Sequence, residues 1–258
     1  MDLRERPLTV TTRHPWEAVR ARFFCRMLAS PATEPMHVLD LGAGDGFVGS
    51  KLLDALPAGS SVTCVDPEYT DQYIASLAGT GARQISFSRT SPDREFDAIV
   101  MLDVLEHIAD DRAFLRDFVL RRLRPGGRLL ISVPAHQVLL TQHDVALGHH
   151  RRYSQSELRD VLVSSGLVPL TSGSLFGSLL APRALAKLRE RVCDTRSRRT
   201  SEPAERIATG ISTWQHGRVV TCAVEGALEI DARLCELAAR VSVPSVGLSA
   251  WALCERAW

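Results

Sequence analysis

The chain has 258 residues, of which 45% are hydrophobic and 24% charged, and its formal net charge is +1. These are ordinary globular values for a chain long enough to bury a sizeable core, and the near-zero charge argues against a dedicated nucleic-acid binder. No apolar signal run opens the sequence, and its longest apolar stretches, such as residues 174–182, are shorter than the ~20 residues that cross a bilayer. We therefore expect a cytoplasmic protein. The six cysteines show no Cys-x-x-Cys spacing, so neither a disulfide framework nor a zinc site is expected.

A helix is predicted first, over residues 15–29, because proline stands at its start and apolar residues follow at helical spacing. A short buried strand over 38–41 comes next and breaks into a glycine-rich turn, Asp-Leu-Gly-Ala-Gly-Asp-Gly, at 40–46. Alternating glycines let the backbone bend sharply and contact a ligand where any Cβ would collide, and the following helix, 48–56, points its amides at that ligand. The turn predicts a nucleotide-like cofactor, which the first helix would cover.

The residues around this turn favour a cationic cofactor. A dinucleotide fingerprint counted from Gly42 fails because Phe47 stands in place of its third glycine. A shifted frame over 44–49 matches the fingerprint but starts inside the turn instead of at the strand end. Asp40 would repel a pyrophosphate and suits a cofactor with an ammonium group, such as S-adenosylmethionine, which carries a sulfonium as well.

The second strand, 61–65, ends in Asp66, a position from which a carboxylate accepts hydrogen bonds from ribose hydroxyls. This spacing suits NAD and S-adenosylmethionine alike. Helices and strands then alternate, which predicts a parallel sheet with right-handed crossovers. The predicted elements are a helix over 72–78, strands over 85–87 and 98–102, a helix over 111–123 and a strand over 128–133.

Together with the turn and Asp66, the stretches 96–108 and 123–134 resemble the class I S-adenosylmethionine-dependent methyltransferases. The resemblance spans residues 38–166 as a series of motifs in the right order, which is more specific than any one of them. Within the class it is closer to small-molecule methyltransferases of the ubiquinone-biosynthesis type and to bacterial relatives with a His-Arg-Arg-Tyr segment, here at 150–153. It implies an α/β fold with a doubly wound, mostly parallel seven-stranded sheet whose last strand is antiparallel, and S-adenosyl-L-methionine as cofactor. The cofactor-binding residues that it implies are Asp40, Gly42, Gly44, Gly46, Phe47, Asp66, Asp103, Val104 and His107.

A long insert is predicted before the last strand. A Ser154/Glu157 capping box opens a helix over 157–164, a strand follows over 167–170, and the last strand is predicted over 246–254. In the resembled fold a short loop joins these two strands, whereas about seventy residues separate them here, and loops of that length are usually functional or structured inserts. We therefore divide the chain into a methyltransferase core with its N-terminal helix (1–172), a helical cap insert (173–244) and a final core strand (245–258).

The insert has three parts of different composition: it is apolar with basic residues over 175–188, polar over 193–210, and amphipathic over 225–241. We expect a helical cap with a mobile centre. In the last part, one helix face is predicted from Leu228, Leu234, Leu237 and Val241. Two roles stay open for the cap, substrate selection or plain packing and dimerisation, and residues 174–192 suit a membrane surface.

Methyl transfer requires a nucleophile aligned opposite the sulfonium and, for a hydroxyl acceptor, a base that takes its proton. Alignment is worth effective molarities of ~10⁵–10⁸ M, and a general base adds ~10²–10⁴-fold. Candidates for catalysis lie in the loop after the fifth strand, with His143 as first choice of base, His149 as second, and Arg152 and Tyr153 beside them. The alternative is a solvated loop in which an arginine merely pairs with Asp144.

A Glu-x-x-Glu-His motif binds divalent metal in ubiquinone-type enzymes and in small-RNA 2′-O-methyltransferases, and Asp103-x-x-Glu106-His107 resembles it. Aspartate replaces its first glutamate here, and a further histidine would have to come from elsewhere. We therefore favour a site without metal, in which these residues shape the wall near the methionine end of the cofactor. Phe47 and Trp16 are expected as further, aromatic walls.

The sequence thus predicts a methyltransferase that acts on a small-molecule or lipid-linked acceptor, most readily at oxygen. The Asp/Asn-Pro-Pro-Tyr motif of base amino-methyltransferases is absent after the fourth strand, so no nucleic-acid partner is expected. Two alternatives stay open: a metal-assisted RNA-end 2′-O-methyltransferase, and a nicotinamide-dependent oxidoreductase that uses the 44–49 frame. The oligomeric state stays open, with a homodimer as one candidate.

Overall fold

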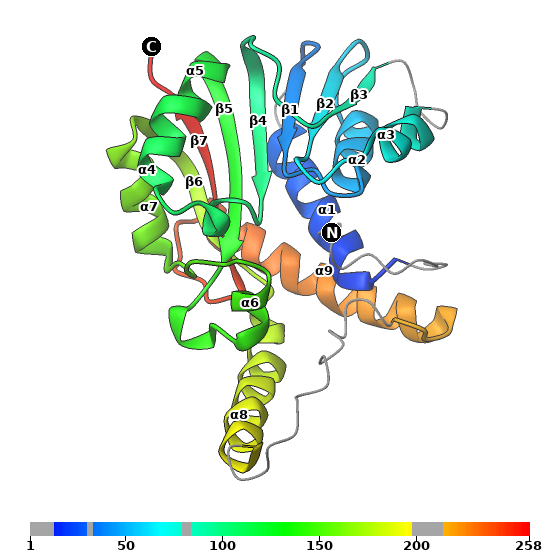
Figure 1. Cartoon of the computed structure of the whole chain (residues 1–258), viewed down its shortest axis with the longest axis vertical. Coiled ribbons are helices and arrows are strands. Elements are labelled where there is room, and N and C mark those ends of the chain that lie inside the picture. Colours follow the sequence, from blue (N-terminus) through cyan, green and yellow to red (C-terminus); the bar gives the residue numbers. More distant parts are fainter. Residues whose placement is uncertain (1–12, 30–32, 79–83, 198–213) are drawn as a thin grey trace.

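The computed structural model describes residues 13–29, 33–78, 84–197 and 214–258. Seven strands form one sheet in the order β3-β2-β1-β4-β5-β7-β6 (Figure 1). The first five strands run parallel, and β7 lies antiparallel between β5 and β6. The strands are β1 (His37–Leu41), β2 (Ser61–Val65), β3 (Ile85–Ser88), β4 (Phe96–Leu102), β5 (Leu123–Pro134), β6 (Leu167–Leu175) and β7 (Ser249–Arg256). The expected doubly wound, mostly parallel sheet is confirmed.

Helices cover both faces of the sheet, each over its own apolar core (Figure 1). One face packs against α1 (Pro15–Ala29), α2 (Phe47–Ala55) and α9 (Arg218–Arg240). The other packs against α7 (Gln155–Ser164) and the helical stretch from α4 (Asp111–Phe114) through a π-helical turn to α5 (Leu120–Arg122). The remaining helices are α3 (Asp71–Ala78), α6 (Gln142–Ala146) and α8 (Leu180–Ser197), with short 3₁₀ turns at 105–107, 137–139 and 177–179. Because parallel strands end at one edge, this arrangement brings the predicted site residues to that edge.

Most predicted elements appear within one or two residues of their expected ends. The first helix has the predicted bounds, and Ser154 opens α7 through the predicted capping box, with both reciprocal hydrogen bonds present. Two strands differ. β6 continues to Leu175, five residues beyond its predicted end, and β7 begins at Ser249 instead of 246 because it pairs with β6 only up to that residue. The division of the chain at 172 and 244 stays a prediction.

Most of the described part of the insert is helical, formed by the 3₁₀ turn at 177–179, α8 and α9. α8 extends to Ser197 into the stretch predicted to be polar and mobile, and residues 198–213 of that stretch lie outside the described part of the chain. No helix within the described ranges is long and apolar enough to cross a membrane.

The predicted single apolar face of α9 is wrong. Leu228 is buried against the core, whereas Leu234, Leu237 and Val241 are exposed. These three residues lie on a different side of the helix, since Leu228 precedes Leu234 by six residues, which is about 240° of rotation at 3.6 residues per turn. The side that packs is formed by Leu228, Ala232 and Cys235.

Candidate functional site

The glycine-rich turn is tied to the end of β2. The backbone amides of Gly42 and Ala43 donate to the carbonyl oxygen of Val65, at 2.8 and 3.1 Å. Gly42, Gly44 and Gly46 have φ angles of 71°, 54° and 75°, a left-handed conformation that glycine adopts without strain. The turn is therefore held by backbone hydrogen bonds to β2 and by the conformation of its glycines. α2 begins immediately after it.

Gly42→Ala is expected to destabilise the protein by about 2–4 kcal/mol, the sum of a left-handed alanine and a clash. A Cβ at Gly42 would lie 2.4 Å from Cγ2 of Val104, another predicted cofactor residue. The double variant Gly42→Ala/Val104→Ala should recover only the clash component. Denaturant unfolding measures both, with Gly226→Ala as control, because a Cβ there meets nothing within 4 Å. Equal losses in the single and double variants would contradict the assignment of a clash.

Asp66 lies at the end of β2 and holds the turn. Its Oδ2 accepts a hydrogen bond from the Gly44 amide at 2.9 Å, and its Oδ1 accepts one from the Glu68 amide at 2.9 Å. A carboxylate offers about four lone-pair sites, so two remain for the hydroxyls of a ligand. The turn and the predicted ribose acceptor thus form one unit.

Asp40 is buried under the turn. Burial, with the nearby negative charges of Asp66 and Asp45, raises the pKa of Asp40 to about 7. One of its carboxylate oxygens has no hydrogen-bond partner among the described residues. A cationic group placed beside this carboxyl would lower its pKa and favour the ionised form, which is the electrostatic role predicted for Asp40.

The start of α1 closes over the turn. The guanidinium of Arg13 lies 2.5 Å from Asp45, 3.4 Å from Glu17 and 3.8 Å from the centre of the Phe47 ring. One face of the predicted wall Phe47 is therefore covered by a cation. The other predicted wall, Trp16, has its ring 6.1 Å from that of Phe176. The predicted covering of the site by α1 agrees with this placement.

Arg13 and Arg20 were not predicted as site residues. Arg20 lies 5.0 Å from the Trp16 ring and ion-pairs with Asp103, whose carboxylate is 2.8 Å away. Asp103 has a φ of 60°, unusual for a residue other than glycine, and its amide donates to Ser132 in the neighbouring strand. For Arg20 the only available signal was its position four residues after Trp16, a spacing that shares a helix face, whereas Arg13 precedes α1 and had no such signal.

A second cluster of polar side chains follows β4. Glu106 is completely buried, neither of its carboxylate oxygens has a hydrogen-bond partner among the described residues, and burial together with Asp103 raises its pKa well above the usual range. The rings of His107 and His149 meet edge to face with centres 4.6 Å apart. One ligand atom from each of these three residues lies within 4.8 Å of the others. His149 supplies the further histidine that the sequence could not identify, and Asp103 faces Arg20 instead.

This trio fits a divalent cation. A carboxylate without partners and two imidazoles are donors that Mn²⁺ or Zn²⁺ accepts, and a cation would offset the cost of burying ionised Glu106. Glu106, His107 and His149 therefore make a candidate metal site.

Asp144, on α6, connects this cluster to the loop after β5. Its carboxylate lies 2.7 Å from Nη2 of Arg152, 3.4 Å from Nδ1 of His149 and 3.2 Å from Nη2 of Arg183. Burial alone would raise the pKa of Asp144, but the neighbouring His149 ring and hydrogen bonds from Arg152 and the Thr141 amide hold it well below its usual range. Arg183 belongs to α8, so the insert contacts the same carboxylate as the candidate base.

The predicted catalytic residues are only partly brought together. Arg152 is buried and also donates to the carbonyl oxygen of Ala135, so its guanidinium is engaged within the protein as the alternative interpretation supposed. Tyr153 donates to Asp111, which also accepts from Arg151. His143 lies half-buried on α6, between Thr141 and Asp144, the two residues of the capping box that opens this helix.

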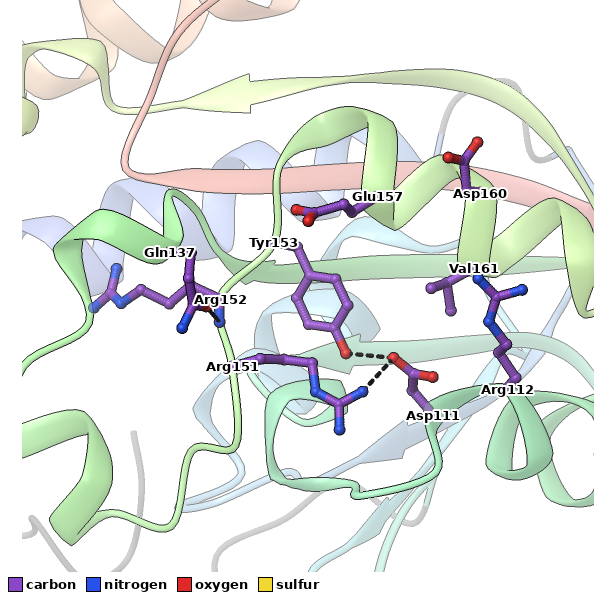
Figure 2. A pocket seen from close by; sticks show the side chains of 9 residues that line it. All are labelled: Asp111, Arg112, Gln137, Arg151, Arg152, Tyr153, Glu157, Asp160 and Val161. Carbon is purple, nitrogen blue, oxygen red and sulfur yellow. Dashed lines mark hydrogen bonds and ion pairs between the residues drawn. The ribbon is translucent and has the colours of Figure 1, made fainter.

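A separate cavity of about 380 Å³ lies beside Tyr153 (Figure 2). Its residues come from the loop after β5 and the starts of α4 and α7. They are Asp111, Arg112, Gln137, Arg151, Arg152, Tyr153, Glu157, Asp160 and Val161. The lining includes no residue of the glycine-rich turn, and it does not include Glu106, His107 or His149. This cavity is therefore distinct from the predicted cofactor cradle, which consists of the glycine-rich turn with Asp40 and Asp66.

A family model described as a methyltransferase domain matches residues 12–172. A demethylmenaquinone methyltransferase from Tropheryma whipplei (strain Twist) is 33% identical over 120 residues, covering 45% of this chain and 48% of that protein. A ubiquinone biosynthesis O-methyltransferase from Parvibaculum lavamentivorans is 27% identical over 146 residues, covering 51% of this chain and 55% of that protein. The chain spans about half the length of these curated relatives.

Among solved structures, an S-adenosylmethionine-dependent methyltransferase from Mesorhizobium loti superposes with a TM-score of 0.53. It is 15% identical and covers 93% of this chain and 97% of its own. At that identity the likeness concerns the fold, which it shares over almost the whole of both chains.

Proposed function

The chain belongs to the methyltransferase-domain family, and from this we propose that it uses S-adenosyl-L-methionine to methylate a small-molecule or lipid-linked acceptor at oxygen. The observation that carries the proposal is the unit formed by the glycine-rich turn and Asp66, with the Glu106–His107–His149 cluster following the adjacent strand. β1, β2 and β4 are neighbours in the sheet, so the three segments that follow them meet at one edge. Cofactor cradle and acid–base groups thus adjoin each other.

The cradle residues fit the cofactor. Asp66 keeps lone pairs for ribose hydroxyls, and Asp40 offers a carboxyl with a partnerless oxygen to the cationic amine. Gly42 leaves no room for a side chain because Val104 lies against it. The cofactor supplies the methyl group from its sulfonium, whose charge disappears on transfer, so the apolar side of Phe47 favours the reaction.

His149 is proposed as the base, ahead of the sequence's first choice, His143. Asp144 lies beside Nδ1 of His149, a position from which a carboxylate orients a catalytic imidazole. His149 also lies beside Glu106 and His107, whereas His143 is not part of that cluster. The proposal places proton removal at His149 and treats Arg152 and Arg183 as groups that position Asp144.

The acceptor class follows from two features. Both curated relatives named above are named for quinone compounds, and one of them is an O-methyltransferase by name, which supports a quinone-type acceptor with a ring hydroxyl and a lipid tail. On α8, Leu185 and Leu188 are exposed, with Lys187 and Arg189 beside them. Exposed apolar residues with cationic neighbours suit the surface of an anionic bilayer, where a lipid-linked acceptor would be found. We therefore propose that the 174–192 segment contacts a membrane surface.

Replacing Asp66 with alanine is expected to weaken S-adenosylhomocysteine binding at least about 100-fold, because a hydrogen bond to a charged group is worth ~1.5–3 kcal/mol and two are lost. The turn also loses its bond from Gly44 to Asp66. Calorimetric titration measures the affinity, with Asp71→Ala as a control on an exposed carboxylate outside the site.

Titration of the unsubstituted protein with NADH separates the alternatives. Binding of S-adenosylhomocysteine but not NADH supports the proposal. Binding of NADH alone would contradict it and favour the nicotinamide-dependent oxidoreductase. Unchanged affinity in the Asp66→Ala variant would remove Asp66 from the cradle. Transfer of labelled methyl to a catechol, compared with a matched aromatic amine, then tests the acceptor atom.

A further inference from the structure

One side of α9 is an exposed apolar stripe. Its residues are Val219, Ala223, Ala227, Ile230, Leu234, Leu237 and Val241. At 3.6 residues per turn they fall within an arc of about 80°, and no charged side chain lies in that arc. The exposed fractions of the five larger side chains are 84% for Val219, 65% for Ile230, 62% for Leu234, 57% for Leu237 and 60% for Val241. An exposed apolar row of this length on a protein surface marks an interaction site.

The opposite side already holds α9 on the core, so the stripe does not turn inward. Leu228, Ala232 and Cys235 pack into the core. The carboxylates of Glu225, Glu229 and Glu236 ion-pair with arginines of α1, at 2.9 to 3.3 Å. These contacts fix the rotation of the helix and leave the stripe facing away from the core.

Side-chain size varies along the stripe in a way that suits a second copy of itself. Its first half carries small residues, Ala223 and Ala227, and its second half carries large ones, Leu234 and Leu237. In an antiparallel pair centred on Ile230, Ala223 would face Leu237 of the partner subunit, and the small half of each helix would receive the large half of the other. The stripe is about 33 Å long, and a two-fold axis at its centre gives an isologous contact that closes as a dimer.

The charges of α9 favour a protein partner over a lipid surface. The helix carries three arginines and four carboxylates, whereas helices that lie on anionic membranes are bordered by lysine and arginine. Five basic residues of the insert lie on α8 instead, four of them in the segment proposed above to meet the membrane. The contact of two helices lies at the small end of specific interfaces, so the dimer should be reversible.

We propose that two copies of this chain associate through their α9 stripes, antiparallel, with Ile230 at the two-fold axis. The proposal is independent of the methyltransferase activity, because it uses neither the cradle nor the Glu106 cluster.

Sedimentation velocity over a range of concentrations tests the association. The unsubstituted protein should show a reversible dimer, and Ile230→Glu or Leu234→Glu should weaken association at least 100-fold. Val163→Glu is the matched control, since Val163 is 51% exposed on α7 and lies outside the stripe; it should dimerise normally. A protein that stays monomeric, whether or not it binds anionic vesicles, or a dimer that persists in both stripe variants, would overturn the proposal.

Cysteine cross-linking tests the register without disturbing the apolar stripe by a charge. In a background where Cys193 and Cys222 are serine, Ile230→Cys should form a disulfide-linked dimer under mild oxidation, because the two copies of that residue meet at the axis. Val219→Cys should not, because its two copies would lie about 33 Å apart at opposite ends of the contact. Equal cross-linking of both variants would indicate a parallel pair and contradict the proposed arrangement.

Discussion

His149→Ala is expected to lower the rate of methyl transfer to a hydroxyl acceptor by about 10²–10⁴-fold, the usual contribution of a general base. The imidazole lies within the Glu106–His107 cluster, and Asp144 lies 3.4 Å from its Nδ1. Affinity for S-adenosylhomocysteine should change little, because the cradle contacts described for the glycine turn and Asp66 do not include His149. Initial rates and calorimetric titration on the same preparations measure the two quantities.

His143→Ala is the matched control, since this second histidine of the loop is also a neighbour of Asp144 in sequence but stands outside the cluster. It should retain activity within a few fold. A large loss in His143→Ala with normal rates in His149→Ala would restore the assignment made from the sequence.

His149 as a metal ligand and His149 as a base predict different effects of other substitutions and of a chelator. If the cluster holds a divalent cation, Glu106→Gln and His107→Ala should lose activity together with His149→Ala, and a chelator should abolish activity that Mn²⁺ or Mg²⁺ then restores. If His149 acts as a base alone, chelation should leave the rate unchanged. Titration of the protein with Mn²⁺ reports the site directly and requires no turnover.

Asp144→Ala is expected to destabilise the protein by about 3–5 kcal/mol, because removal of one partner leaves the buried Arg152 guanidinium as an uncompensated charge. Both side chains are buried, and they lie 2.7 Å apart. For a chain of this size each kcal/mol shifts the midpoint of thermal unfolding by roughly 2–4 °C, so a fall of about 10 °C is expected. Asp71→Ala is the control, because the exposed ion pair between Asp71 and Arg89 contributes at most ~1 kcal/mol.

The loss in Asp144→Ala should depend on pH in a defined direction. The pKa of Asp144 is depressed in the folded protein, so its stabilising contribution is present above the unfolded pKa near 4 and fades as the pH falls below it. The stability difference between the two proteins should therefore shrink in acid. A difference that stays constant from neutral pH to pH 3, or a loss below 1 kcal/mol at neutral pH, would show that the carboxylate does not compensate Arg152.

The sequence by itself determined most elements and the glycine-rich turn, because the signals for both are local. Alternating glycines after an apolar strand, the Ser154/Glu157 capping box and Asp66 at the end of β2 each act within a few residues of themselves. Their conformations depend on backbone preferences that neighbouring residues set. The order of strands and helices then follows, because parallel crossovers admit few arrangements.

Only the tertiary structure decided which polar groups meet. Asp103 pairs with Arg20 on α1, His149 joins Glu106 from more than forty positions away along the chain, and Arg183 reaches Asp144 from the insert. The same holds for α9, whose two apolar sides look alike in sequence and differ only in which one the core covers. Such contacts depend on how whole elements pack, and helical or strand periodicity carries no information about a partner on another element.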